Sequence, residues 1–308
     1  MGSPPFADKA LAALINAGHN VVAVVSAPPS RRGRGRQSSA NSVIALATQY
    51  NLPVLQPISA KSSEFKAEFA ALKCDLAVVV SYGQILDAEF LELPKLACVN
   101  VHASLLPRWR GASPIQSAIK SGDLVSGVCI QKMVLALDAG EVLATREISL
   151  NNESTGPWLF QQCAEQGAEL ITEFVNQVSR TKQLPPGRPQ DEALVTHCGK
   201  VKKQDGKINW QQPATDVYRQ LRANYGWPGS FCILPSKDNL IVHAAKLVLS
   251  DSIAGEPGQI IIGDNSEVFV CCESGAIELI DVQRSGKAKL TAKQFMNGNS
   301  IKSGEKLN

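Results

Sequence analysis

Two apolar runs constrain the fold of this 308-residue chain more than any other feature. Residues 21–26 form a continuous, valine-rich run of the kind that is buried on both faces of a parallel sheet, and residues 75–81 are expected to form another strand. Helical patterns and a further short strand alternate with these runs, at 8–17, 40–50, 53–55 and 62–72. This alternation predicts an α/β fold with a doubly wound, mostly parallel sheet, whose ligands bind beyond the carboxyl ends of the strands.

The pattern changes further along the chain. A helix at 114–121 and two strands at 125–134 and 142–150 precede a long helix at 157–179. Residues 184–190, Leu-Pro-Pro-Gly-Arg-Pro-Gln, are typical of a linker. Beyond residue 205, a helix is expected at 213–223. Five short strand-like runs, separated by glycine or proline, follow at 230–234, 239–249, 258–262, 267–272 and 276–283 and predict a small antiparallel barrel. We therefore expect a first domain at 1–183, a linker at 184–204 and a barrel domain at 205–308.

Composition narrows the class of protein. Hydrophobic residues make up 44% of the sequence, which supports sizeable cores and argues against disorder. The net charge of +3 is too small to indicate nucleic-acid binding by itself. No apolar run approaches the roughly 20 residues of a membrane span, and the first residues lack the features of a signal peptide. The eight cysteines show no Cys-x-x-Cys spacing, so we expect free thiols in a reducing compartment and no zinc site.

The stretch 98–116 carries the strongest chemical signal. Asn100 and His102 are two residues apart at the end of a predicted strand, so their side chains leave the same face. An amide and an imidazole placed in this way can polarise a carbonyl and move a proton. A purely structural pair is the alternative that these two residues leave open. Each of the other three histidines is explained more simply by a structural or surface position.

Longer motifs allow a more specific comparison. Residues 100–116 read Asn-Val-His-Ala-Ser-Leu-Leu-Pro-Arg-Trp-Arg-Gly-Ala-Ser-Pro-Ile-Gln, and a Leu-Asp-x-Gly loop follows at 137–140. With these motifs the chain resembles the folate-dependent formyltransferases from about residue 2 to residue 307. The resemblance is strongest to the members that act on charged initiator tRNA. It implies a Rossmann-like first domain and an OB-like barrel that binds tRNA.

The resemblance implies that Asn100, His102 and Asp138 are catalytic. The implied reaction moves the formyl group of 10-formyltetrahydrofolate, a co-substrate, to the α-amine of methionyl-tRNA. Asn100 would donate to the oxyanion, His102 would carry a proton and Asp138 would orient the imidazole. From local sequence alone, Asp138 is explained equally well as a turn residue before Gly140. This chemistry requires no metal.

Two further sets of residues are implied to bind the substrates. The folate set comprises Tyr82, Gly83, Ile85, Ser104, Leu105, Leu106 and Pro107, although the two leucines could equally anchor the loop. The tRNA set comprises Arg31, Arg32, Arg34, Arg36, Lys200, Lys202 and Lys203. The arginines lie in a stretch that contains no acidic residue. This stretch could become ordered on phosphates; a solvated flexible loop is the alternative. The lysines indicate either a phosphate contact or an ordinary charged surface.

The start of the sequence departs from the family that it resembles. That family has a central β-strand before the Gly-Ser-Pro turn, whereas Met1 stands here where the strand should end. A missing central strand would leave backbone N–H and C=O groups of its two neighbours without partners, which is costly. We therefore expect an apolar segment upstream of Met1 to stabilise the fold.

Other functions compete with this interpretation. Formyltransferases of small-molecule amines and formyl-folate hydrolases use the same folate donor. The residues after Pro107, the arginine-rich loop and the barrel favour tRNA as the substrate. A non-catalytic RNA-binding protein is the alternative from another class, and the intact triad argues against it. We expect a monomer without a membrane partner in the bacterial cytoplasm, although an organelle matrix would suit the sequence equally.

Overall fold

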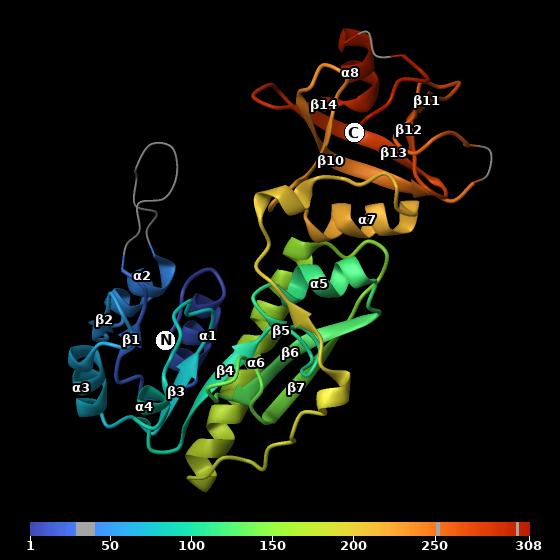
Figure 1. Ribbon diagram of the computed structural model, residues 1–308. Helices are drawn as coiled ribbons and strands as arrows, with labels where there is room; N and C mark the ends of the chain where they lie inside the picture. The colour runs from blue at the N-terminus through green and yellow to red at the C-terminus, as the bar shows by residue number, and fades with distance from the viewer. Residues whose placement is uncertain (29–40, 251–252, 300–301) are drawn as a thin grey trace. The chain divides into compact units, whose positions relative to one another are not determined.

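The computed structural model describes residues 1–28, 41–250, 253–299 and 302–308. The chain divides into two compact units (Figure 1). The first unit contains Met1–Pro114, Val125–Ser149 and Phe160–Cys198, and the second contains Ile115–Leu124, Leu150–Leu159 and Gly199–Asn308. The stretch 184–204, which we expected to be a linker, spans the change from the first unit to the second.

The main sheet of the first unit has four strands in the order β3-β4-β6-β7. Their bounds are Leu76–Val79, Ala97–His102, Val125–Lys132 and Val142–Ser149. β3 and β4 are parallel, whereas β6 is antiparallel to both β4 and β7. A separate parallel pair joins β1, Val24–Val25, to β2, Val54–Leu55. The predicted α/β class is confirmed, and β6 and β7 are antiparallel because a connection too short for a crossover joins them.

Helices flank these strands (Figure 1): α1 (Ala7–Asn16), α2 (Ser42–Gln49), α3 (Ser63–Ala71), α4 (Ala88–Leu91) and the long α6 (Gly156–Thr181). The helix α6 packs closely on the sheet at Gly167. A Cβ atom at this position would lie 3.1 Å from Val101 of β4 and 3.3 Å from Val128 of β6. This contact places α6 against the two strands that carry the candidate site.

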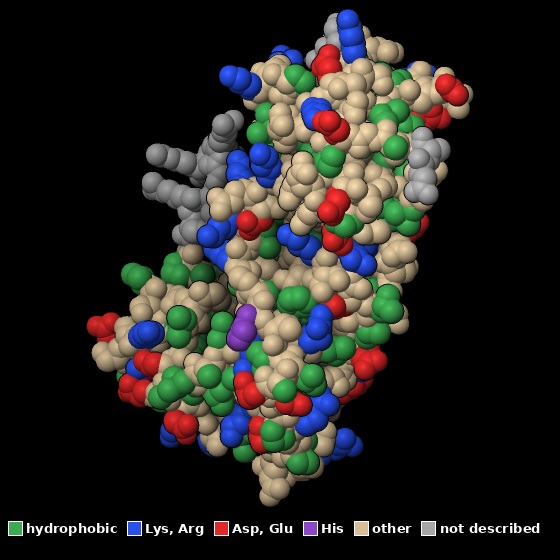
Figure 2. Space-filling model, turned by 45° about the vertical axis from the view of Figure 1, so that its right-hand side comes forward, with side chains coloured by type: hydrophobic (Ala, Val, Ile, Leu, Met, Phe, Trp, Pro, Cys, Tyr) green, Lys and Arg blue, Asp and Glu red, His purple; other side chains and the backbone are tan. Residues whose placement is uncertain are grey.

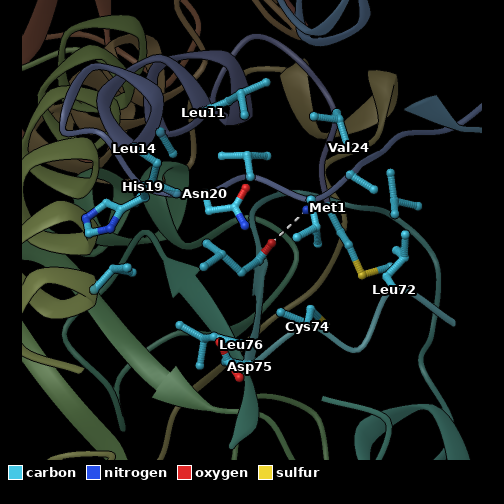
Figure 3. A pocket seen from close by; sticks show the side chains of 18 of the residues that line it. Met1, Leu11, Leu14, His19, Asn20, Val24, Leu72, Cys74, Asp75 and Leu76 are labelled. Atoms are coloured by element: carbon cyan, nitrogen blue, oxygen red, sulfur yellow. Dashed lines mark hydrogen bonds between the residues drawn. The ribbon is translucent and has the colours of Figure 1, made fainter. Parts of the chain in front are cut away.

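The strand expected at 21–26 is reduced to Val24–Val25. Between β1 and β3 lie the first two residues of the chain (Figure 1). The amino group of Met1 donates to the carbonyl of Val78 at 2.7 Å, and the N–H of Gly2 donates to Val25 at 2.8 Å. Beyond them is a cavity of about 900 Å³, lined on one side by residues 19–25 and on the other by residues 74–78 (Figure 3). Residues 21–23 face this cavity instead of a neighbouring strand, so regular pairing is confined to β1.

The second unit is a curled antiparallel sheet in the order β11-β12-β13-β10-β9, with β14 paired to β13. In chain order, β9 to β14 are Ser230–Ile233, Asn239–Val248, Ile260–Ile262, Val268–Cys271, Ala276–Arg284 and Leu290–Thr291. Its helices are α5 (Pro114–Ser121), α7 (Ala214–Ala223) and α8 (Ala292–Asn299), although Pro114 itself belongs to the first unit. The end of the chain closes the curl, because Leu307 donates to Gly258 and Asn308 exchanges hydrogen bonds with Ile233 of β9. The predicted barrel-like architecture is confirmed.

Several short elements complete the fold. The strand β5, Arg110–Gly111, pairs in parallel with β8, His197–Cys198. Two 3-10 helices, η1 and η2, span Glu192–Leu194 and Lys203–Gly206. All eight cysteines are free thiols, as the sequence predicted. In the part of the chain that the structure describes, none of the helices is long and apolar enough to cross a membrane.

Candidate active site

One face of the sheet gathers polar side chains at the carboxyl end of β4. Asn100 lies opposite Gln131 of β6, and His102, the last residue of β4, lies opposite Cys129. Residues that face each other across an antiparallel pair have their side chains on the same side of the sheet. Asn100, His102 and Gln131 therefore share one face. His102 and Gln131 are buried, with exposed fractions of 6% and 2%.

The connection between β6 and β7 brings Asp138 to this face. Its φ of 51° lies in the left-handed region, which aspartate adopts more readily than most residues. Oδ1 of Asp138 accepts a hydrogen bond from Nε2 of Gln131 at 2.8 Å, and Oδ2 accepts one from the N–H of Gly111 at 2.8 Å. Oδ1 also lies 3.7 Å from Nδ1 of His102. The structure thus brings His102 and Asp138 together, with Asn100 on the same strand as His102.

The second nitrogen of His102 contacts the backbone. Nε2 lies 3.1 Å from the carbonyl oxygen of Trp109. A carbonyl only accepts, so we assign the proton to Nε2 in this contact. Nδ1 faces Oδ1 of Asp138 at 3.7 Å, beyond hydrogen-bond distance, and the carboxylate would compensate the charge of a doubly protonated ring. This arrangement suits an imidazole that gains and loses a proton.

Cys129 is the thiol nearest to His102 in strand register, but it is a poor nucleophile. Its side chain is fully buried, and burial raises the pKa of the thiol to about 12. The reactive thiolate is therefore scarce at neutral pH. The groups on this face favour proton transfer and charge stabilisation over a thiol-based covalent route.

Residues 188–198, at the end of the first unit, lie against the site, and we call this segment the strap. The backbone of Arg188 exchanges two hydrogen bonds with Val142, each of 2.9 Å. Oγ1 of Thr196 accepts from the N–H of Trp109 at 2.9 Å, and the carbonyl of Thr196 accepts from Arg110 at 2.9 Å. The strap therefore contacts both the loop after β4 and the strand after the β6–β7 connection.

The predicted folate loop at 104–107 follows β4 directly. Ser104 is fully buried, and its hydroxyl donates to the carbonyl of Arg108 at 2.7 Å. Leu106 is buried in a cluster with Cys129 and Val142. The side chains of Ser104 and Leu106 thus hold the loop, whereas Leu105 and Pro107 are partly exposed. A folate contact through this loop stays a prediction.

The second predicted folate segment follows β3. Tyr82 is buried in the core around β1 and β3, and burial raises the pKa of its hydroxyl to about 12. Gly83 has a left-handed φ of 79°, and Ile85 is 76% exposed. Of these three residues, Ile85 and the backbone of Gly83 are the groups that remain accessible to a ligand. Their contact with folate also stays a prediction.

The residues predicted to bind tRNA are only partly described. Arg31, Arg32, Arg34 and Arg36 lie outside the described residues. Lys200, Lys202 and Lys203 are exposed at the beginning of the last segment of the second unit. On the face shown in Figure 2, lysine and arginine side chains are interspersed with aspartate and glutamate. Charge on that face therefore does not by itself outline an RNA-binding surface.

Comparison with known protein families identifies the family to which the chain belongs. The profile described as "Formyl transferase" matches residues 1–175, and "Formyl transferase, C-terminal domain" matches residues 200–300. The chain belongs to the formyl transferase family. Its predicted class, a transferase, is confirmed by this membership.

Bacterial relatives align with nearly the whole chain. A methionyl-tRNA formyltransferase of Paramagnetospirillum magneticum is 39% identical over 307 residues, covering 100% of this chain and 98% of the relative. One of Roseobacter denitrificans is 40% identical over 304 residues, covering 99% and 96%. These alignments include both units and the strap.

Solved structures share the fold at low sequence identity. An N-formyltransferase from Helicobacter canadensis, in complex with folinic acid and dTDP-3-aminofucose, has a TM-score of 0.66 and 14% identity over 92% of this chain and 97% of its own. HypX from Aquifex aeolicus, in complex with tetrahydrofolic acid, has a TM-score of 0.57 and 18% identity over 81% of this chain. The match spans only 43% of HypX. At such identities these likenesses establish the fold alone.

Two glutamines of the site were not predicted from the sequence. Gln131 interrupts the apolar run of β6, and a polar residue in such a run is a signal that could have identified it. Gln190 contacts the Asp138 loop from the strap. It lies in a proline-rich stretch that is typical of linkers, so local sequence carries no signal for its role.

Proposed function

We propose that this protein transfers the formyl group of 10-formyltetrahydrofolate to the α-amino group of methionyl-tRNA, the reaction that prepares the initiator for translation. The observation that carries the proposal is the grouping of His102 and Asp138, 3.7 Å apart, beside Asn100 at the carboxyl end of β4. Similarity along the whole chain to relatives named for this reaction supports the choice of acceptor.

The proposed reaction exchanges one carbon–nitrogen bond for another. The amine nitrogen of methionyl-tRNA attacks the formyl carbon, which becomes tetrahedral and carries an oxyanion. Asn100 donates to this oxyanion, a contact whose loss typically costs about 2.7–4 kcal/mol. The bond between the formyl carbon and N10 then breaks. N10 gains the proton that the attacking nitrogen loses, which leaves formylmethionyl-tRNA and tetrahydrofolate.

His102 is the proposed carrier of this proton. Asp138 orients the ring and balances its charge when both nitrogens are protonated. An ordinary α-amine has a pKa of about 7.7–8.0, so a large share is already neutral near neutral pH. Only a modest base is therefore needed, which suits an imidazole. The carbonyl of Trp109, which binds Nε2 in this structure, must release that nitrogen when it takes part in proton transfer.

Substrate binding is assigned to the two sets of residues identified in the sequence. In this proposal Leu105, Pro107, Ile85 and the backbone of Gly83 contact the folate, because they are the accessible groups of the two strand-end loops. The arginine-rich segment and Lys200, Lys202 and Lys203 contact tRNA phosphates. A monomer in the bacterial cytoplasm is the proposed working form.

The decisive experiment offers several acceptors to the same protein. The protein is incubated with radiolabelled 10-formyltetrahydrofolate and methionyl-tRNA, and separately with glycinamide ribonucleotide, a dTDP-amino sugar or water alone. We expect label in methionyl-tRNA at a rate at least about a hundredfold above the other acceptors. Faster labelling of a small-molecule amine, or release of formate in water, would overturn the proposed acceptor.

A further inference from the structure

Gln190 lies where the strap meets the loop that carries Asp138. Its Nε2 donates hydrogen bonds to the carbonyl oxygens of Asp138, at 2.8 Å, and of Gly140, at 2.7 Å. Its Oε1 accepts a hydrogen bond from Nε of Arg110 at 2.9 Å. Carbonyls only accept and a guanidinium only donates, so a single orientation of the amide satisfies all three partners.

The arginine that orients Gln190 is itself held in place. Arg110 is 5% exposed, and one of its terminal nitrogens donates to Oε1 of Glu192 at 2.8 Å. This hydrogen bond lowers the pKa of the Glu192 carboxyl below its usual range. The next residue, Gly111, is the backbone donor to the carboxylate of Asp138. Hydrogen bonds therefore connect Arg110 of β5 to Gln190 and Gln190 to the backbone of Asp138. The carboxylate of Asp138 in turn binds the N–H of Gly111, also in β5.

Asp138 depends on such support for its conformation. The left-handed φ of 51° costs free energy even for aspartate, which adopts it more readily than most residues, so Asp138 keeps this conformation only where its surroundings determine it. Gln131 and Gly111 hold its carboxylate oxygens, whereas Gln190 holds its backbone carbonyl. A misplacement of about 1 Å in a catalytic group can cost roughly a hundredfold in rate.

We propose that Gln190 is a positioning residue, which fixes the backbone of Asp138 so that the carboxylate faces His102. It acts through Asp138, because its three hydrogen bonds go to the loop and to Arg110. The proposal rests on the proposed function, since the role is in formyl transfer. Gln190 lies in the stretch that we expected to be a linker, so under this proposal part of that stretch supports catalysis.

The test compares two variants with a matched control. Gln190→Ala removes the side chain, and Gln190→Met keeps its length but removes every hydrogen bond. We expect both to lower kcat about 10–100-fold and to leave KM for either substrate within about twofold. Gln183→Ala changes an exposed glutamine of the same unit and should behave as wild type. Circular dichroism and Tm establish that each variant is folded.

A second measurement separates positioning from a general structural role. In an Asp138→Ala background, under single-turnover conditions with excess enzyme, Gln190→Ala should lower the rate by less than about twofold, because its effect passes through the missing carboxylate. An equal loss in both backgrounds, or an unchanged kcat in Gln190→Met, would overturn the proposal. If the wild type used another acceptor, the proposed function would fail, while the same comparison with that acceptor would still test Gln190.

Discussion

At the scale of single residues, the proposed chemistry depends on two side chains that share one face of β4. His102→Ala removes the proposed proton carrier, and Asn100→Ala removes the amide that we propose as the donor to the oxyanion. Each substitution should lower the rate of formyl transfer at least about a hundredfold, as is usual for lost acid–base or oxyanion groups. Labelled formylmethionyl-tRNA measures the rate, and Tm should change little. Near-normal turnover of His102→Ala would remove this residue from the mechanism.

Gly111 shows how a single backbone position supports the site. A Cβ atom at this position would lie 2.1 Å from the carbonyl oxygen of Cys198, and its φ of 123° disfavours other residues. Gly111→Ala must therefore separate β5 from β8 and disturb the hydrogen bond to Asp138. We expect Tm to fall by at least several degrees and the rate to fall with it. Gly199→Ala is the matched control, because a Cβ there meets no described atom within 4 Å; equal behaviour of the two variants would contradict this prediction.

At the scale of elements, the cavity between β1 and β3 has the position and the lining that one more strand would need. Val78 and Val80 both bind the backbone of Met1, and strand alternation turns the backbone groups of Leu76 towards the cavity as well. The walls include apolar side chains such as Leu14 and Leu72 (Figure 3). An extended apolar segment that continues from Met1 would pair with both edges and cover these walls.

We predict that fusing about five alternating valine and isoleucine residues before Met1 raises Tm by several degrees, because backbone groups gain partners and apolar walls are covered. Differential scanning calorimetry provides the measurement. A Gly-Ser fusion of the same length is the control, since it offers backbone but little apolar surface. Equal Tm values for the two fusions would show that the cavity does not accept a strand.

The cavity beside Met1 gives stability a specific dependence on pH. In a chain that starts at Met1, burial lowers the pKa of its amino group from 8.0 to about 6 in the folded state. The unfolded chain keeps the usual pKa, so between pH 6 and pH 8 it binds more protons than the folded chain. The free energy of unfolding should therefore rise with pH across this window, by up to about 2–3 kcal/mol. Urea unfolding at the two pH values measures it, and in the apolar fusion, which has no amine at this place, the rise should be smaller by that amount.

At the scale of the whole molecule, tRNA binding should depend on local charge because the net charge is only +3. We predict that changing Arg31, Arg32, Arg34 and Arg36 together to glutamine weakens tRNA binding and flattens its dependence on salt. Each lost phosphate contact should reduce the slope of log affinity against log salt by roughly one unit or somewhat less. Arg34→Ala alone should lower transfer to tRNA, whereas hydrolysis of formyl-folate should not change. Parallel salt plots of equal height would mean that this segment does not bind RNA.

Much of the fold could be predicted because its patterns are local. The helices at 114–121 and 213–223 and the strands of the second unit lie within a few residues of their predicted positions, since apolar periodicity and turn residues specify each separately. The length of the strand expected at 21–26 could not be predicted from local patterns in the same way. Its apolar residues suit a strand, but pairing requires a neighbour, and residues 21–23 face a cavity.

The sequence by itself determined the α/β class, the barrel, the family and the placing of Asn100 and His102 on one face, because strand alternation and motif spacing act over short distances. Only the tertiary structure decided what holds Asp138. Its carboxylate meets Gln131 and Gly111, and its carbonyl meets Gln190 from the strap. These contacts join residues that are far apart in the chain and belong to separate elements. Local sequence carries no information about them, because such hydrogen bonds exist only after the sheet, the loop and the strap have packed together.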